Sequence, residues 1–359
     1  MNKTSESVDR PIPCFMFNFL AEKKFKPNEM DEETSEVKKP MTEGYMKILD
    51  TIQMPEDILC CQFNPDGSEL AVGMVDGTIQ ILNVQTSRTV FSLELDTLNQ
   101  CRHPVTHLKY MHPTRQDALL IATYASGLVK MWKCDSQYCV HTIDENRQTL
   151  AVTMNPSGKR FVTTGASTGI YVYDAVTMKK INTCQASERR RKMDGHRFHV
   201  FAVKYNPNHR HMFITGGWDN TVQYWDERQE HAVHKFSGPH ICGDSLDINP
   251  VTDHILTGSW RKDEELELWD FVSGEKIKDI PQDKKHKSKV YCAQYLGKHS
   301  IFFGGTDNNM AGIIDLRTRT IKGQLFDLPQ GVYSIDNDRV GKPPKLAISS
   351  GRQIYLIEI

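Results

Sequence analysis

The chain has no long apolar run, and this absence limits what it can be. None of its 359 residues falls in a window approaching the roughly 18 consecutive apolar residues of a membrane helix. Its first residues also lack the basic start, apolar core and small-residue cleavage site of a signal peptide. We therefore expect no membrane span and no secretory leader.

The cysteines are irregularly placed. The nine cysteines are odd in number and show no paired C-x-x-C spacing, so neither a disulfide framework nor a zinc site is predicted. Reduced thiols favour the cytoplasm, with the nucleus or a cytoskeletal or ciliary structure as alternatives. The cysteines are Cys14, Cys60, Cys61, Cys101, Cys134, Cys139, Cys184, Cys242 and Cys292.

An excess of charge is missing as well. Lys and Arg number 44 against 45 for Asp and Glu, a net charge of −1, whereas general nucleic-acid binding needs many unbalanced basic groups. The sequence also has no GxxxxGK[ST] phosphate loop, no GxSxG nucleophile elbow and no HExxH metal motif. Catalytic residues, metals and cofactors are therefore not predicted, and the chain is not expected to be an enzyme.

What the chain does contain is a repeat. His196 lies 29 residues before Trp225, and Asp219 lies six residues before the same Trp. The 29-residue separation recurs in two further pairs, His103–Trp132 and His240–Trp269. Seven segments of alternating polarity, each typical of a half-buried strand, reach their last apolar position 41 to 52 residues apart. These positions are Leu82, Trp132, Tyr173, Trp225, Trp269, Ile314 and Ile357.

These spacings resemble those of the WD-repeat (WD40) family of β-propellers, from about residue 45 to residue 359. The resemblance implies an all-β, seven-bladed β-propeller with four strands in each blade. In that family a loop His, a strand Ser or Thr, a turn Asp and a strand Trp form a hydrogen-bonded chain within a blade. The candidates are His103 in the second unit, His196, Thr215, Asp219 and Trp225 in the fourth, and His240, Thr257, Asp263 and Trp269 in the fifth.

The N-terminal 43 residues differ from the repeats. We expect residues 1–43 to form a flexible extension, within which residues 13–25, PCFMFNFLAEKKF, are an aromatic segment that either packs on the propeller or anchors a partner. The propeller then spans residues 44–359. Its last unit ends after three strands, so the alternating stretch at 45–52 is expected to supply the fourth and close the ring.

One face of such a propeller would gather basic and aromatic side chains. Loops between blades and the turns before each third strand lie together there, and they carry residue types that concentrate binding energy. We expect Trp218 to pack and Trp260 to be exposed. The sequence thus predicts a non-enzymatic scaffold that binds an acidic peptide or protein surface. The candidate partner-binding residues are Tyr124, Arg197, Trp218, Trp260, Arg261, Lys262 and Arg352.

Three alternatives remain open. WDER (225–228) and IDLR (314–317) resemble the WDxR box of propellers that act as substrate receptors of cullin-type ubiquitin ligases, in which Arg228 and Arg317 would contact the adaptor. The aromatic N-terminal segment would suit a structural component of a cytoskeletal or ciliary assembly. A central channel lined by Asp, Glu and His around a cavity would instead favour an enzyme.

Overall fold

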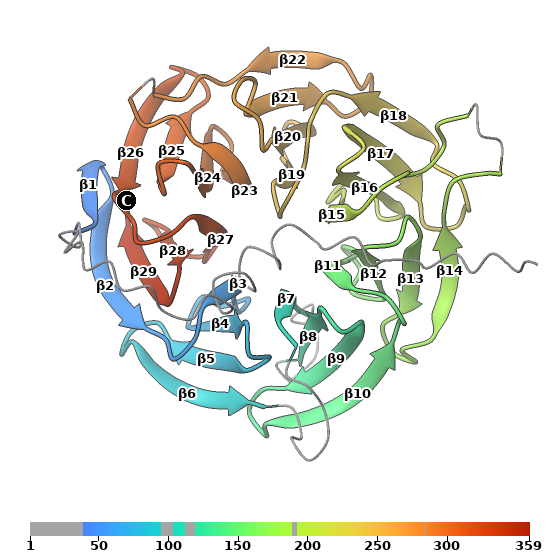
Figure 1. The fold of residues 1–359 in the computed structure, drawn as a ribbon, viewed down its shortest axis with the longest axis horizontal. Helices are drawn as coiled ribbons and strands as arrows, with labels where there is room; N and C mark the ends of the chain where they lie inside the picture. The colour runs from blue at the N-terminus through green and yellow to red at the C-terminus, as the bar shows by residue number, and fades with distance from the viewer. Residues whose placement is uncertain (1–38, 95–102, 112–118, 189–191, 284) are drawn as a thin grey trace, which may run out of the picture. The chain divides into compact units, whose positions relative to one another are not determined.

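Seven antiparallel sheets are arranged around a central axis, as Figure 1 shows. The computed structural model describes residues 39–94, 103–111, 119–188, 192–283 and 285–359, and this part of the chain contains strands and no helix. Accordingly, none of its segments is a helix long and apolar enough to cross a membrane. The predicted all-β, seven-bladed β-propeller is confirmed; residues 1–38 lie outside the described residues.

Blades one to five each consist of four consecutive strands, and the first strand of each is innermost (Figure 1). Blade one contains β3 (Ile58–Phe63), β4 (Glu69–Met74), β5 (Ile79–Asn83) and β6 (Arg88–Leu93). Blade two contains β7 (Val105–Tyr110), β8 (Leu119–Tyr124), β9 (Leu128–Lys133) and β10 (Tyr138–Asp144). Blade three contains β11 (Thr149–Met154), β12 (Arg160–Gly165), β13 (Ile170–Asp174) and β14 (Lys180–Cys184). Blade four contains β15 (Val200–Tyr205), β16 (Met212–Gly217), β17 (Thr221–Asp226) and β18 (His234–Ser237). Blade five contains β19 (Leu246–Ile248), β20 (His254–Gly258), β21 (Leu266–Asp270) and β22 (Lys276–Asp279).

The last two blades use strands from the start of the described chain. Blade six contains β23 (Lys289–Leu296), β24 (Ser300–Thr306), β25 (Ala311–Asp315) and β26 (Thr320–Phe326), with β1 (Met41–Gly44) as a fifth, outer strand. Blade seven contains β27 (Val332–Asn337), β28 (Lys345–Ser350) and β29 (Gln353–Glu358), with β2 (Lys47–Gln53) as its outer strand. β2 pairs antiparallel with β29, from Lys47↔Glu358 to Gln53↔Gln353, so an early strand and the last strand share one sheet.

Burial follows the distance of each strand from the axis. Every residue of β3 is buried, whereas the outer strand β10 is mostly exposed. The apolar core lies between neighbouring sheets: Ile81 and Leu93 of blade one, for example, pack in one cluster with Leu108 and Leu120 of blade two. Each sheet is therefore covered on both faces by its neighbours, and a blade depends on the blades beside it.

The inner strands share an irregularity that helps to shape the channel. In six of the seven blades the register between the first and second strands shifts near the start of the inner strand, as between Val200 and Ala202 or Val290 and Cys292. Such a bulge bends the strand and re-aims the side chains that follow it. The later residues of each inner strand consequently occupy equivalent positions around the axis.

Deleting residues 351–359 should unfold the whole propeller, because β29 is the only link between β2 and β28. Its loss would expose two sheet edges and the cores on both sides. The matched control deletes residues 1–44, which removes β1 but leaves every blade with four strands. Thermal unfolding followed by circular dichroism should show a cooperative transition for the control and none for the C-terminal deletion. A cooperative transition in the C-terminal deletion would contradict the conclusion that β29 closes the ring.

Candidate binding face and central channel

Blade four contains a continuous chain of side-chain hydrogen bonds. His196 Nδ1 lies 2.8 Å from Asp219 Oδ2 and its Nε2 lies 2.6 Å from Thr215 Oγ1, which also accepts the indole N–H of Trp225 at 2.7 Å. Burial alone would raise the pKa of Asp219, but the hydrogen bond and charge of His196, together with hydrogen bonds from Thr221 and Arg197, lower it. The chain ties the loop before β15 to β16, to the β16–β17 turn and to β17.

Blade five differs from the expectation. The Trp269 indole donates to Thr257 Oγ1 at 3.1 Å, but His240 Nδ1 contacts Asn220 of blade four at 2.7 Å. The side chain of Asp263 is 91% exposed and pairs with Lys287 at 3.1 Å. The predicted roles of His240 and Asp263 are therefore wrong. The segment between the paired strand residues Thr257 and Glu267 is two residues longer than the segment between Thr215 and Gln223 of blade four, and this insertion carries Asp263 away from the blade.

In blade two, one hydrogen bond takes the place of the four-residue hydrogen-bond chain. Trp132 Nε1 donates to the hydroxyl of Tyr124 at 3.3 Å, because Ala122 stands where blade four has its Thr. Within the described part of the chain, the His103 ring has no hydrogen-bond partner. Tyr124 is fully buried, so the prediction that it contacts a partner is wrong; its hydroxyl supplies the missing acceptor instead.

Blade three has an equivalent hydrogen-bond network made of other residue types, which the sequence analysis did not predict. Buried Glu145 accepts hydrogen bonds from the hydroxyls of Tyr173 at 2.7 Å, Thr163 at 2.5 Å and Thr149 at 2.8 Å. Arg147 pairs with Glu145 at 2.9 Å and donates to Ser167 at 2.8 Å. The sequence did contain a signal for this network: Tyr173 stands where blades two, four and five have Trp, and a phenol needs a different hydrogen-bond partner from an indole.

The face bearing the interblade loops and the turns between second and third strands is hereafter the loop face. Its cations are largely matched by carboxylates, contrary to the expectation of a basic face. Arg261 pairs with Glu264 at 3.6 Å and Glu267 at 3.5 Å, and Arg352 with Glu56 at 3.0 Å. Lys262 and Arg197 are exposed and have no carboxylate partner within the described ranges; the Arg197 guanidinium donates to the carbonyl of Lys192 at 2.9 Å. Residues 189–191 of the basic RRRK run lie outside those ranges.

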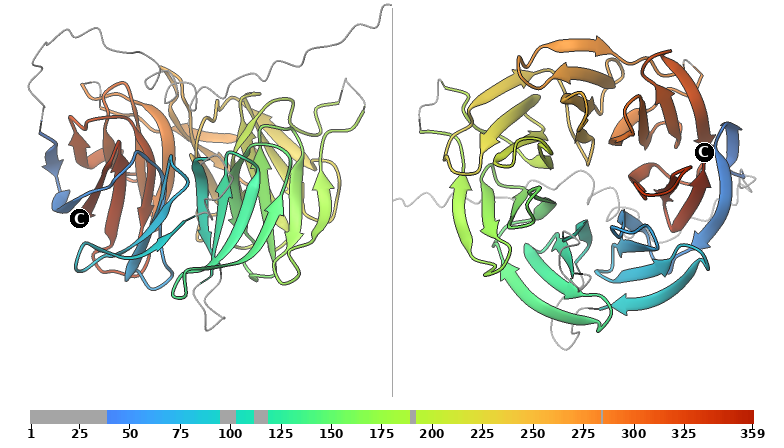
Figure 2. Two further views of the ribbon diagram at one scale, coloured as in Figure 1. Left: turned by 60° about the horizontal axis from the view of Figure 1, so that its bottom comes forward. Right: turned by 180° about the vertical axis from the view of Figure 1, so that it is seen from behind.

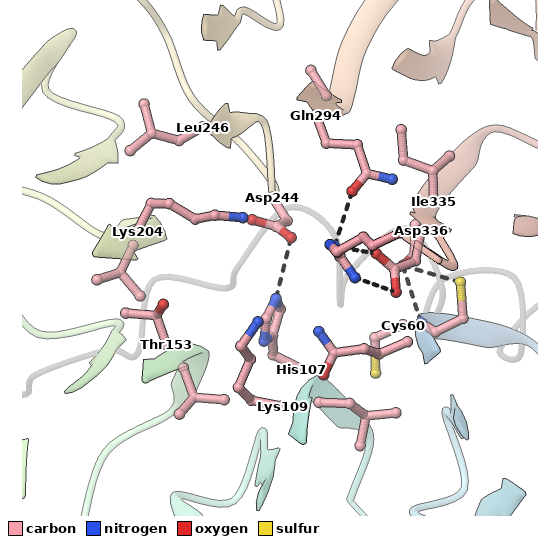
Figure 3. A pocket seen from close by; sticks show the side chains of 18 residues that line it. Cys60, His107, Lys109, Thr153, Lys204, Asp244, Leu246, Gln294, Ile335 and Asp336 are labelled. Atoms are coloured by element: carbon pink, nitrogen blue, oxygen red, sulfur yellow. Dashed lines mark hydrogen bonds and ion pairs between the residues drawn. The ribbon is translucent and has the colours of Figure 1, made fainter. Parts of the chain in front are cut away.

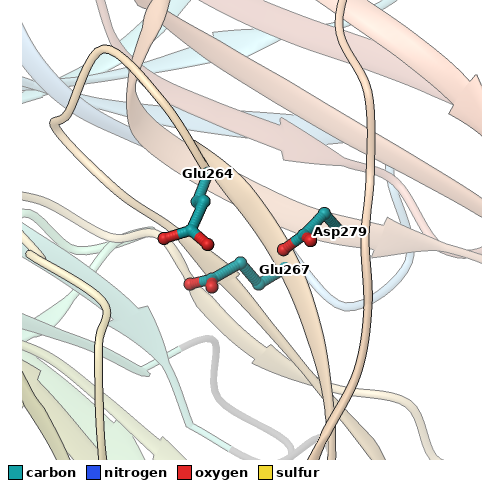
Figure 4. A group of neighbouring side chains, drawn as sticks. All are labelled: Glu264, Glu267 and Asp279. Carbon is teal, nitrogen blue, oxygen red and sulfur yellow. The ribbon is translucent and has the colours of Figure 1, made fainter.

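Three acidic residues of blade five gather near the loop face (Figure 4). Oxygens of Glu264, Glu267 and Asp279 lie within 4.8 Å of one another. The Lys276 ammonium contacts all three, at 3.1, 3.3 and 2.9 Å respectively. Because a lysine cation already neutralises the group, these carboxylates form an ion-pair cluster and are a poor candidate for a metal site.

An arc of aromatic rings lies where the inner strands begin, at the loop-face end of the channel. In blade four, the Trp218 ring lies 5.1 Å from His199 and 5.2 Å from Phe201. In blades five to seven, Trp260 stacks on Tyr291 at 6.2 Å, and Tyr291 lies 5.2 Å from Tyr333. We call these six residues the aromatic arc.

Trp218 and Trp260, the two tryptophans predicted to bind a partner, have similar environments in the aromatic arc. Trp218 is half-buried, and its indole N–H is buried without a hydrogen-bond partner. Trp260 is also half-buried: Lys289 Nζ lies 4.6 Å from its ring centre, and its N–H approaches Thr306 Oγ1 at 3.4 Å. The expectation of an exposed Trp260 is therefore wrong, because residues of blade six cover part of its ring.

Arg228 and Arg317 lie on the opposite face, which bears the turns between first and second and between third and fourth strands and is hereafter the turn face. The Arg228 guanidinium forms two bonds with Asp226 of its own blade, at 2.8 and 2.5 Å. Arg317 lies 3.9 Å from Asp315. Both side chains remain largely exposed, in blades four and six.

The central channel is lined by residues near the ends of the inner strands (Figure 3). Six of these residues surround a cavity of about 40 Å³. With Asp247, they form what we call the channel ring: Gln62, Lys109, Thr153, Lys204, Asp247, Gln294 and Asp336.

Ring residues join neighbouring blades through backbone amides. The N–H of Tyr110 donates to Gln62, that of Tyr295 to Asp247 and that of Phe63 to Asp336, each at 2.8 Å. In each case a side chain of one blade binds the next blade around the ring. No sequence motif signalled this pattern, because the donors are backbone groups and the acceptors are of two residue types.

Charge in the channel is paired unevenly. Lys204 lies 3.0 Å from Asp247, and Arg339, which reaches over from the β27–β28 turn, lies 2.6 Å from Asp336. Lys109 has no carboxylate partner within the described residues, and burial together with the charges of Lys204 and Arg339 lowers its pKa to about 8.

Near the loop-face end, His107 of blade two bridges the channel to Asp244, with 3.3 Å between Nε2 and Oδ2. Burial would raise the pKa of Asp244, but the hydrogen bond and charge of His107, with the charge of Lys204, lower it to about 2. The channel does contain Asp and His beside a cavity, but each carboxylate named here is engaged by a cation or a backbone amide.

Fold and repeat chemistry together define a seven-bladed repeat propeller, and comparison with known proteins specifies the family. The family model described as "WD domain, G-beta repeat" matches residues 187–226, which span the blade-four chain. The model described as "Anaphase-promoting complex subunit 4 WD40 domain" matches residues 47–113. The chain therefore contains WD40 repeats and folds as a seven-bladed β-propeller.

Similar curated proteins share modest identity with the chain. Ribosome biogenesis protein YTM1 of Scheffersomyces stipitis is 24% identical over 156 residues, 44% of this chain and 30% of YTM1. WD repeat-containing protein 1 of Mus musculus is 28% identical over 115 residues, 32% of this chain and 18% of that protein. Ribosome biogenesis protein WDR12 homolog of Drosophila mojavensis is 22% identical over 299 residues, 79% of this chain and 68% of that protein. The matched parts thus span less than a third of the first two relatives.

Asp219→Ala should destabilise the propeller by about 1–3 kcal/mol, because it leaves the buried His196 and the backbone amides of Arg197 and Thr221 without their acceptor. Asp263→Ala is the matched control, since that side chain is 91% exposed and should change stability by less than about 0.5 kcal/mol. Urea unfolding of both variants measures the difference. Equal losses of stability in the two variants would contradict the assignment of a buried hydrogen-bond chain to Asp219 of blade four.

Lys109→Met should change the pH dependence of stability. With a folded pKa of about 8 against 10.5, the unfolded chain binds this proton more tightly, so the wild type loses stability as pH falls from 10.5 to about 8. The variant should lack this loss, which is at most roughly 3 kcal/mol. Urea unfolding of both proteins at about pH 7.5 and about pH 10 isolates the difference; parallel profiles would refute the lowered pKa.

Proposed function

We propose that this protein is a non-enzymatic scaffold that binds a segment of another protein on its loop face, over the aromatic arc. The WD-repeat relatives support an interaction role. The choice of the loop face rests on the contacts of this protein's own side chains. We place the scaffold in the cytoplasm, on the cysteine pattern of the sequence.

The aromatic arc is the observation that carries the proposal. Rings from blades four to seven converge on one end of the channel, and Tyr, Trp and His combine apolar area with polar groups able to orient a peptide. The buried indole N–H of Trp218 has no acceptor, and an unpaired buried donor is costly. A peptide carbonyl bound over blade four would supply that acceptor after a small side-chain adjustment.

A preference for acidic partners rests on two residues at the rim. Arg197 and Lys262 are exposed on the loop face and are not neutralised by described carboxylates, in contrast to Arg261 and Arg352. Acidic residues flanking the bound segment would contact these two cations. Since such exposed contacts are weak individually, we expect them to set orientation and association rate more than affinity.

A binding role accounts for the channel better than catalysis does. Asp336 and Asp247 bind backbone amides of neighbouring blades, and Asp244 binds His107. Groups used in this way hold the ring together and are not poised to transfer protons. The ligase-receptor alternative depends on Arg228 and Arg317, and the doubly bonded Arg228–Asp226 pair does not favour it.

Affinity purification followed by reconstitution tests the proposal. A Trp218→Ala, Tyr333→Ala double variant should lose the direct partner of the wild type, with the affinity of the purified pair falling at least about tenfold. The matched control is Tyr138→Ala, which removes a 65% exposed aromatic residue from the outer strand of blade two. It should retain the partner.

Two outcomes would contradict the proposed function. If the double variant, shown to be folded by its unfolding transition, binds the partner as the wild type does, the aromatic arc is not the binding surface. If Arg228→Ala instead removes a cullin adaptor from the purified complex, the ligase-receptor alternative replaces the scaffold proposal.

A further inference from the structure

Three outer strands close their free edge with a side chain. In blades seven, two and three, the residue that follows the outer-strand bulge is Asp50, His141 and Asn182 respectively. Its side chain accepts the N–H of the threonine that comes next, at 2.8, 2.9 and 2.9 Å. An outer strand has no further strand to bond these N–H groups, so the side chain satisfies them and hinders pairing with another chain.

Blade six has a glycine at the equivalent position. Gly323 follows the same kind of register shift in β26, but it has no side chain with which to bind the next N–H. β1 covers this edge instead, from Met41↔Phe326 to Gly44↔Gly323. The outer edge of blade six is therefore a site for a fifth strand.

Two glycines make the fit of that strand specific. A Cβ atom added at Gly44 would collide with the carbonyl oxygen of Lys322, and one added at Gly323 would lie 2.6 Å from Cγ of Met46. Gly44 also has a φ of 75°, a conformation that other residues adopt only with strain. A strand seated on this edge therefore needs a glycine opposite Gly323, and a second copy of β1 meets that requirement by identity.

β1 buries little apolar surface. All four of its residues are exposed, including Met41 at 55%, so its attachment depends mainly on backbone hydrogen bonds. Blade six keeps four strands without it. Because segments with few buried apolar contacts open at a small cost in free energy, β1 should leave β26 more readily than any strand inside a blade. Its departure exposes an edge without a side-chain cap, and the released strand is the complement of that edge.

We propose that two copies of this protein exchange β1, so that residues 41–44 of each chain pair with β26 of the other. Exchange rebuilds the same pairing between chains, which makes it a low-cost route to a dimer. Only Tyr45 and Met46 connect β1 to β2, and Met46 is buried at 3% exposure whereas Tyr45 is 75% exposed. Such a short connection requires the two blade-six rims to lie side by side in the dimer.

This interface is separate from the aromatic arc. β1, the first blue strand, lies on the outer rim of the ring in both views of Figure 2, whereas the arc lies at one end of the channel. Dimerisation through the rim leaves both loop faces free. The dimer would present two aromatic arcs, and a partner that engages both would bind more tightly than one that engages a single arc.

Disulfide trapping between two singly substituted full-length chains tests the exchange. Glu43 and Gln324 are directly opposite in the β1–β26 pairing, and antiparallel partners have the Cα separation that a disulfide needs. A Glu43→Cys chain is mixed with a Gln324→Cys chain, incubated and oxidised. A covalent heterodimer should form, and its yield should rise at least about fivefold between about 5 and about 100 µM protein, since exchange is bimolecular.

Three controls accompany the mixture. Thr183→Cys places the second thiol at the equivalent position of β14, where Asn182 closes the edge, and should give at most about a fifth of the yield with Glu43→Cys. The double variant Glu43→Cys, Gln324→Cys shows, when dilute, that the pair forms a disulfide within one chain. The unsubstituted protein reveals any cross-linking through native thiols such as that of half-buried Cys139.

Competition gives a further readout. Deleting residues 1–44 from the Gln324→Cys chain removes the β1 that occupies its own edge, so the yield with Glu43→Cys should rise. Urea unfolding checks that each variant is folded. If Gln324→Cys does not fold, Met41→Cys and Phe326→Cys, at the other end of the same pairing, replace the pair.

Two results would overturn the proposal. The first is a double variant that forms its disulfide while the mixed single variants give no more heterodimer than the β14 control, which would show that β1 stays on its own blade. The second is a yield unchanged by deletion of residues 1–44, because the chain's own β1 must compete for the edge if exchange occurs there.

Discussion

The propeller depends on the contact between neighbouring inner strands, where seven sheets come closest together. Side chains of the channel ring accept backbone N–H groups of the next blade, from Gln62 to Tyr110, from Asp247 to Tyr295 and from Asp336 to Phe63. Each bond satisfies a strand N–H that would otherwise face the channel. The blades are thus joined by directional bonds near the axis and by apolar packing farther out.

Within the blades, a different set of bonds fixes the loops, and its chemistry varies. Blade four uses His196 and Asp219, blade three uses Glu145 and Arg147, and blade two retains only the Trp132 bond to a tyrosine. These solutions share the requirement that a buried donor on the third strand finds an acceptor. The architecture therefore tolerates different residues as long as that acceptor is present.

Sequence reasoning predicted the fold because strand alternation and repeat spacing are local signals that recur seven times. It failed where a position is set by geometry that the spacing does not reveal. Asp263 has the expected offset from Trp269, but the two-residue insertion in its turn moves it to the surface. Tyr124 has the residue type of a contact site, yet it fills the place of a missing acceptor. The channel ring could not be foreseen, since its members share a position and no residue type.

The pairing of β2 with β29 has a consequence for biosynthesis. A ribosome produces β2 long before β29, so the nascent chain must keep this strand unpaired, or provisionally paired, while the other blades form. The ring can close only after the final strand has left the exit tunnel. Until then the growing protein is an open arc with two unfinished ends, and it is during this interval that a chaperone would be most useful to it.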